Sequence, residues 1–212
     1  MSVTKYDFNS KDSMIQKLID YSTNPDDDTI RIKTQVRDIL YHSPELLYAL
    51  NNKDFENELF DKDGNLNVDE EGEPLGEWDR YFGESSNIRP YLFIPETQTE
   101  AKNYLCYQVS SSELVRYNSS EKYLLLTFTI YIDGKDSMDE STGIARHDLI
   151  ASIIREHFAW TGLEISTTTP TSDKEGMSDN NYITRTIGYQ IILPNSIVKT
   201  EDGVTSYKNK RW

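Results

Sequence analysis

The sequence is poor in the residues that metal centres and disulfides require. It contains one cysteine, Cys106, and three histidines among 212 residues. A single cysteine excludes an intramolecular disulfide and a cysteine-rich zinc site, and this usage fits a reducing compartment. No segment carries the glycine-rich phosphate loops GxxxxGK or GxGxxG. These shortages remove several common enzyme classes, and we expect a protein with no resident cofactor or metal.

A long apolar run is also missing. The longest one lies around Tyr123 to Ile132, far short of the roughly 20 residues that cross a bilayer. The first ten residues, MSVTKYDFNS, lack the apolar region of a signal peptide. We therefore expect a soluble protein that is not secreted and has no membrane partner. Its 14 tyrosines suit a surface that contacts other proteins.

Negative charge is concentrated in one segment. Between Asp54 and Glu84, twelve carboxylates stand against two bases, Lys62 and Arg80, so this segment carries −10 of the formal net charge of −14. The remainder is close to neutral, which argues against a nucleic-acid clamp, because phosphate binding needs clustered Lys and Arg. Because the segment is rich in glycine and has few apolar residues, we expect an exposed acidic insertion with little fixed structure.

Hydrophobic periodicity predicts helices and strands in the rest of the chain. Helices are expected over Asp12 to Tyr21, from near Thr29 to Leu40, after Ser43-Pro44, and from Ile144 to Trp160 with Ser141 or Thr142 as the cap and Gly162 at the end; strands are expected over Tyr91 to Ile94, Tyr104 to Val109, Tyr123 to Ile132 and Tyr182 to Leu193. This order predicts an α+β fold, with a small antiparallel or mixed sheet of about four strands and helices packed on one face. Residues 1–198 would form one domain with the insertion at 54–84, and residues 199–212 a C-terminal extension.

One stretch of the insertion can be aligned with a calcium-binding EF-hand loop. Asp61 and Asp63 would be its third and fifth positions, Gly64 the sharp turn at the sixth, and Glu70 the bidentate twelfth ligand. The first ligand position then falls on Leu59, which cannot coordinate a cation. An Asp-Gly turn in a solvated acidic loop is the competing interpretation.

A second constellation allows a metal-dependent nuclease. Asp133 and Lys135 follow a strong strand, and Asp136, Asp139 and Glu140 lie nearby. Carboxylates and a lysine at a strand end can hold a divalent metal and activate water. A charged loop between a strand and a helix is the alternative interpretation.

Histidine and cysteine chemistry has little support. His147 and His157 are ten residues apart, which is about 15 Å along a helix and too far to share one metal. We expect both to find partners on the helix flanks. Cys106 stands within a strand among apolar residues, as an inert core thiol does.

Three segments resemble structural proteins of tailed bacteriophages. They are RPYLFIPETQTEAKNYLCYQV from Arg89 to Val109, ARHDLIASIIREHFAW from Ala145 to Trp160, and YITRTIGYQIILPNS from Tyr182 to Ser196. Their pattern and order are similar to those of neck and tail-completion proteins, the group of tail terminators and head-tail connectors. The resemblance implies a small sheet flanked by helices and assembly into rings between portal and tail. It carries no catalytic residues to transfer.

The prediction is therefore a non-enzymatic virion component, assembled in the bacterial host cytoplasm. It would form a homo-oligomeric ring of six or twelve copies at the head-tail junction or the top of the tail, in contact with neighbouring neck, portal-side or tail proteins. Viral DNA would pass through without specific binding, and an acidic insertion facing the channel would repel its phosphates. Two alternatives stay open: a metal-dependent phage nuclease using Asp133 and Lys135, and an assembly factor outside the virion.

Overall fold

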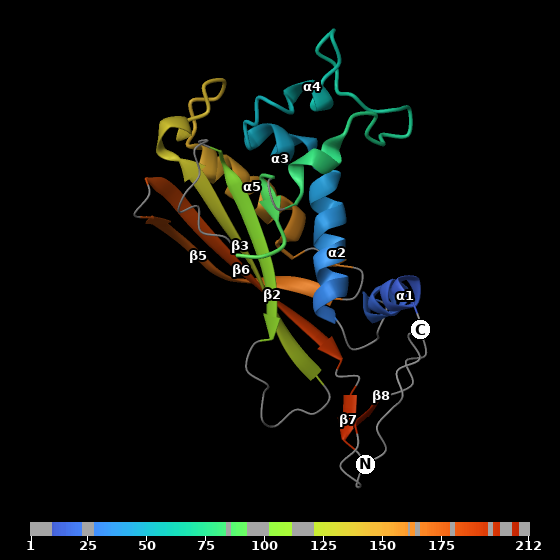
Figure 1. Ribbon diagram of the computed structural model, residues 1–212. Coiled ribbons are helices and arrows are strands. Elements are labelled where there is room, and N and C mark those ends of the chain that lie inside the picture. Colours follow the sequence, from blue (N-terminus) through green and yellow to red (C-terminus); the bar gives the residue numbers. More distant parts are fainter. Residues whose placement is uncertain are drawn as a thin grey trace.

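The computed structural model describes residues 10–22, 28–83, 86–92, 102–111, 121–160, 162–163, 166–178, 181–194, 197–199 and 205–207 (Figure 1). Their helices are α1 (Lys11–Ser22), α2 (Asp28–Tyr41), α3 (Pro44–Ala49), α4 (Glu56–Leu59) and α5 (Arg146–Phe158), with short 3-10 helices η1 (Trp78–Tyr81) and η2 (Gly134–Asp136). Their strands are β1 (Ile88–Arg89), β2 (Tyr104–Ser111), β3 (Glu121–Asp133), β4 (Gly162–Leu163), β5 (Ser166–Met177), β6 (Tyr182–Pro194), β7 (Ile197–Lys199) and β8 (Thr205–Tyr207).

Six of these strands form one mixed sheet in the order β1-β2-β3-β6-β5-β4. Only the β1–β2 pair is parallel, and the other neighbours are antiparallel. The two long strands β3 and β6 pair along their full length, from Glu121 opposite Pro194 to Asp133 opposite Tyr182. β7 and β8 form a separate two-stranded ribbon.

The helices α2 and α5 cover one face of this sheet, as Figure 1 shows. α2 packs against β2, and α5 packs against β3 and β6. Strand alternation sends Phe128, Ile130 and Ile132 of β3 into the core between the layers, where they are fully buried. The predicted α+β fold with helices on one face is confirmed.

The sheet is larger than expected because the sequence of β5 gives no strand pattern. Its residues STTTPTSDKEGM carry no apolar alternation, and those from Pro170 to Met177 are exposed. β5 lies near the edge of the sheet, where β4 pairs only with Ser166 and Thr167. A border strand tolerates proline because an outward N–H needs no partner, and the register shift between Pro170 and Ser172 marks a bulge there.

Two local predictions are wrong. The strand expected at Tyr91 to Ile94 is absent at Tyr91 and Leu92, and residues 93–94 lie outside the described residues. β1 begins three residues earlier, at Ile88, and ends before Pro90. Proline cannot donate to a strand ladder, so the pairing stops at Arg89. Helix α5 begins at Arg146 and ends at Phe158, so Ala145 stands at the cap position and supplies no side-chain cap. The predicted caps Ser141 and Thr142 precede that position and donate their hydroxyls to Asp139.

The acidic segment is folded, contrary to our expectation. We call residues 54–83 the acidic module: α4, two consecutive β-hairpins with bridges Phe60↔Leu66 and Val68↔Pro74, and η1. Leu59, Trp78 and Tyr81 are fully buried and anchor it in the main core. The indole Nε1 of Trp78 also donates to the carbonyl of Glu58 at 2.8 Å. Three large side chains therefore fix a module whose remaining residues are mostly polar.

Helix α1 presents an apolar stripe to solvent. Met14, Ile15 and Leu18 share one side of the helix and are 44 to 62 % exposed. Figure 1 shows α1 away from the sheet, beside the lower end of α2. In proteins an amphipathic helix owes most of its stability to packing of its apolar face, so this stripe is a surface suited to a partner.

Candidate functional site

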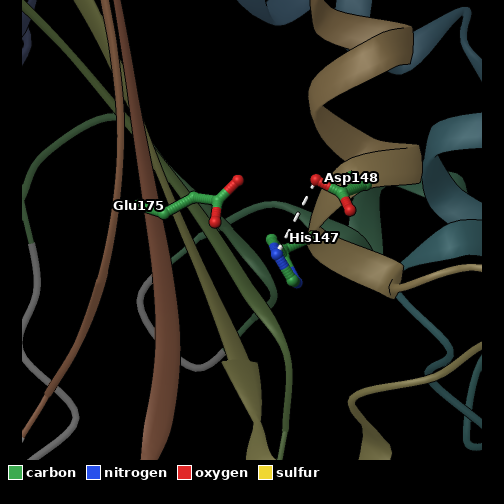
Figure 2. A group of neighbouring side chains, drawn as sticks. All are labelled: His147, Asp148 and Glu175. Carbon is green, nitrogen blue, oxygen red and sulfur yellow. Dashed lines mark ion pairs between the residues drawn. The ribbon is translucent and has the colours of Figure 1, made fainter.

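The described residues contain one group of side chains that could hold a metal ion: His147, Asp148 and Glu175, whose ligand atoms lie within 4.8 Å of one another. His147 and Asp148 stand in the first turn of α5, and Glu175 reaches toward them from β5 (Figure 2). His147 Nε2 is 3.7 Å from Asp148 Oδ1, and its Nδ1 is buried without a hydrogen bond. Sequence reasoning missed this group, because Glu175 lies in a strand that it did not predict.

Arg185 of β6 already neutralises these carboxylates. It stands directly opposite Glu175 across the β5–β6 pair, and its Nη1 lies 3.2 Å from Glu175 Oε1 while also pairing with Asp148. Its Nε and Nη2 donate to Asp173 at 2.8 and 2.9 Å. A divalent cation would have to displace this guanidinium. We therefore interpret the group as an ion-pair network that connects α5 to the sheet.

The pKa values in this network follow from the same contacts. Hydrogen bonds from Arg185 lower the pKa of the Asp173 carboxyl below its usual value. The same hydrogen bond to Asp173 raises the pKa of Arg185. Both directions favour the charged forms, as expected for paired groups.

The nuclease candidates are divided between a turn and a depression. Asp133 caps η2 by accepting the N–H of Lys135 at 2.8 Å, and neither residue lines the depression that the other three acidic residues share. Asp136, Asp139 and Glu140 do line one depression of about 360 Å³, together with Tyr48 and Arg146. The structure thus separates Asp133 and Lys135 from the other three acidic residues.

Asp136 and Asp139 have structural partners within that depression. The Asp136 carboxylate accepts hydrogen bonds from Asn51 at 2.9 Å, from Asn103 at 2.6 Å and from Arg146 at 3.1 Å. Asp139 accepts from the hydroxyl of Ser141 and from the hydroxyl and N–H of Thr142. Hydrogen bonds from these two residues lower the Asp139 pKa to about 2. Carboxylates held in this way are poor candidates for open metal ligands.

A buried asparagine network adjoins the depression. Asn52 donates to Asn87 at 2.6 Å, and Asn87 donates to the carbonyl of Asn103 at 2.8 Å. Asn103 in turn donates to the carbonyl of Leu50 and accepts the N–H of Asp133. All three asparagines are buried, and the network joins the end of α3 to β1, β2 and the end of β3. No sequence pattern identified it.

The EF-hand candidate is built as two turns with their own hydrogen bonds. Asp61 accepts the N–H groups of Asp63 and Asn65, both at 2.8 Å, and Asp69 accepts those of Glu71 and Glu73, both at 2.9 Å. Gly64 and Gly72 supply the positive φ, +83° and +89°, that each turn needs. The hydrogen bond from Asn65 also lowers the pKa of Asp61.

The repeated turn favours the Asp-Gly interpretation over an EF-hand. Residues 59–66 and 67–74 are two copies of one eight-residue hairpin pattern, a repeat that the sequence analysis missed. The Asp61 carboxylate accepts hydrogen bonds from the backbone of its own turn, and Glu70 belongs to the next hairpin. Among the described residues, the Asp61, Asp63 and Glu70 carboxylates form no group of metal-ligand geometry.

The remaining histidines and the cysteine make packing contacts. His42 Nε2 lies 3.3 Å from Glu73 of the acidic module, and His157 Nε2 lies 2.8 Å from Glu45 of α3. Cys106 is buried on the other face of the sheet with Tyr104, Tyr131 and Tyr182. These positions agree with the expected flank partners for His157 and the expected core thiol.

Among the helices of the described residues, none is long and apolar enough to cross a membrane. Comparison with curated proteins gives no match. The model of the YomW family matches residues 43–209, which is most of the chain. A match of this extent shows that the chain belongs to the YomW family, whose name suggests a phage-associated protein.

Proposed function

We propose that this chain is a non-enzymatic structural protein of a tailed-phage virion that assembles into a ring at the head-tail junction or the top of the tail. The ring would connect portal and tail and let DNA pass, with assembly in the cytoplasm of the bacterial host. The single observation that carries the proposal is the exposed apolar stripe of α1. Membership of a phage-associated family supports it as well.

The stripe favours assembly for an energetic reason. Burying apolar surface stabilises a contact by roughly 25 cal/mol per Å², and Met14, Ile15 and Leu18 leave much of their surface in water. No equivalent helix stripe lies on α2 or α5, which bury their apolar sides against the sheet. In a heterologous contact, α1 of one copy would cover a different surface on the next, and such contacts form a ring when the rotation between neighbours closes.

An enzymatic function is less well supported by the geometry. Asp133 and Lys135 are engaged in a helix-capping turn, and the carboxylates near His147 are compensated by Arg185. The chemistry that a metal-dependent nuclease needs, acidic ligands converging on one open position, is not assembled by these residues. We therefore keep the nuclease as an outcome of the test.

The test is the oligomeric state of the purified chain, read by light scattering and negative-stain electron microscopy. We expect rings for the wild type and a loss of at least about tenfold in association for Leu18→Glu, since a charge would be buried in the contact. Gln16→Glu adds the same charge on another side of α1 and should leave assembly unchanged.

Three results would contradict the proposal. A wild-type chain that stays monomeric at high concentration would remove the ring. Magnesium-dependent DNA cleavage that is lost in Asp133→Ala would establish the nuclease. Absence of the protein from purified virions, measured by mass spectrometry, would favour an assembly factor.

A further inference from the structure

Several exposed or half-buried apolar side chains lie at the end of the molecule that carries the acidic module. Met138 and Ile144 are exposed in the loop after η2, where Met138 forms an isolated bridge with Ala145. Tyr48 lines the depression beside that loop, and its ring meets Phe60 edge-on at 5.5 Å. Phe60 is the bridge partner of Leu66. We call these five residues, Tyr48, Phe60, Leu66, Met138 and Ile144, the apolar ridge.

The apolar ridge is accessible, unlike the core beneath it. Tyr48, Leu66, Met138 and Ile144 are 38 to 51 % exposed. Two depressions open along it: one of about 360 Å³ beside Tyr48, and one of about 690 Å³ beside Phe60 and Asn67. Figure 1 shows α4 and the loop after η2 projecting from the same end of the molecule. Such a surface offers sockets for large side chains of a partner.

Carboxylates surround the apolar ridge and determine which partner it suits. Asp61 and Asp63 line the depression beside Phe60 together with one cation, Lys62. The depression beside Tyr48 is lined by three carboxylates and two cations: Asp136, Asp139, Glu140, Lys53 and Arg146. Carboxylates therefore outnumber cations in both. The acidic module as a whole carries most of the net charge of the chain. A partner that fits must therefore combine positive charge with apolar anchors, and nucleic acid would be repelled.

The chain itself contains a segment with this chemistry. Residues 208–212 read Lys-Asn-Lys-Arg-Trp and follow Tyr207, so three cations and two aromatic rings stand within six residues. Trp and Arg are the residue types that most often anchor protein interfaces. The segment is complementary to the apolar ridge in charge and in apolar character.

The reach of the chain decides whether this contact forms within one copy. Tyr207 ends β8, and its ribbon follows the Pro194 end of β6, whereas the loop after η2 follows the opposite end of β3. β3 has 13 residues and therefore spans roughly 40 Å. Five residues extend at most about 17 Å. The ribbon and α4 lie at opposite ends in Figure 1, so only a second copy can supply the segment.

We propose that the apolar ridge of one copy binds residues 208–212 of a second copy, with Trp212 in a depression and Lys208, Lys210 and Arg211 against the surrounding carboxylates. This inference rests on the proposed ring, for which it names a contact between neighbouring copies. The contact joins unlike surfaces at opposite ends of the molecule, which is the heterologous arrangement that a ring requires.

A peptide of residues 204–212 tests the surface directly. The receptor is the full chain with Lys208→Glu, Lys210→Glu and Arg211→Glu, so that its own segment cannot compete. We expect the labelled peptide to bind, measured by fluorescence anisotropy, and to bind more weakly as NaCl is raised from about 0.05 to about 0.5 M. Adding Asp63→Lys and Glu140→Lys to the receptor should weaken binding by about tenfold or more.

A matched control separates the surface from overall charge. Glu156→Lys reverses one carboxylate that is exposed near the far end of α5, and it should leave peptide binding unchanged. No binding, or equal loss with Glu156→Lys, would overturn the inference.

Self-association distinguishes this inference from the proposed function. We expect the triple Lys208, Lys210 and Arg211 reversal to weaken ring formation at least about tenfold relative to the wild type. Rings that persist unchanged in the triple variant would refute the contact while leaving the ring intact. A wild-type chain that never self-associates would instead refute the ring.

Discussion

Replacing Arg146 should lower the free energy of unfolding more than replacing an exposed residue does. Its guanidinium is buried between α3 and the loop after η2, where Nη1 donates to the carbonyl of Ala49 at 3.0 Å and Nε to that of Asp136 at 3.1 Å. Nη2 pairs with the Asp136 carboxylate at 3.1 Å, and Nη1 lies 3.5 Å from that of Asp139. Arg146→Met fills a similar volume but supplies none of these donors.

The size of the effect follows from what Arg146→Met leaves behind. Arg146→Met leaves the carbonyls of Ala49 and Asp136 and the two carboxylates without these donors. Each buried polar group left unsatisfied costs about 1–3 kcal/mol, so we expect a total of about 3–5 kcal/mol. With a urea dependence of about 2 kcal/mol per molar, the unfolding midpoint should fall by roughly 1.5–2.5 M. Arg146→Lys keeps the charge but not the planar fork, so we expect an intermediate loss.

Urea titration followed by circular dichroism measures this change. Arg155→Met is the control, because Arg155 makes a partly exposed ion pair with Asp173 and should cost no more than about 1 kcal/mol. If the free energy of unfolding of Arg146→Met lies within about 1 kcal/mol of the wild-type value, the loop after η2 does not depend on this side chain and the reasoning fails.

Two further predictions concern turns. Gly76→Ala would place a Cβ against the backbone carbonyl of Glu58, so we expect thermal unfolding to show about 1–3 kcal/mol of destabilisation. Unchanged stability would mean that the backbone of the acidic module shifts to make room for the Cβ. The depressed pKa of Asp139, about 2, stabilises the fold above about pH 4, and this contribution is lost as pH falls toward 2. Carboxyl NMR should show the Asp139 pKa rising in the Ser141→Ala, Thr142→Ala variant; an unmoved pKa would contradict the assigned cause.

The sequence predicted the elements that carry a clear period. β3, β6 and α5 were found because their buried residues recur every two residues in a strand or on one helical face. β5 was missed because a border strand with exposed side chains need not alternate. The acidic module was misjudged because Leu59, Trp78 and Tyr81 are too widely spaced to give any local pattern.

The candidate sites were harder to predict than the fold. Arg185 meets Asp148 from α5 and Glu175 from β5, and such a meeting depends on strand register that no single sequence reveals. The sequence grouped the acidic residues after β3, yet Asp133 caps η2 while Asp136 accepts hydrogen bonds from Asn51, Asn103 and Arg146. Charge patterns located the residues without telling their partners.

The outer edge of β5 bears on whether the sheet can pair with other chains. Beyond Thr168, no described strand lies beside that edge, and open edges readily recruit strands of other chains into aggregates. Pro170, the bulge that follows it, and the charges of Asp173, Lys174 and Glu175 all discourage such pairing. In the proposed ring this edge would stay unpaired, and contacts between copies would be left to side-chain surfaces.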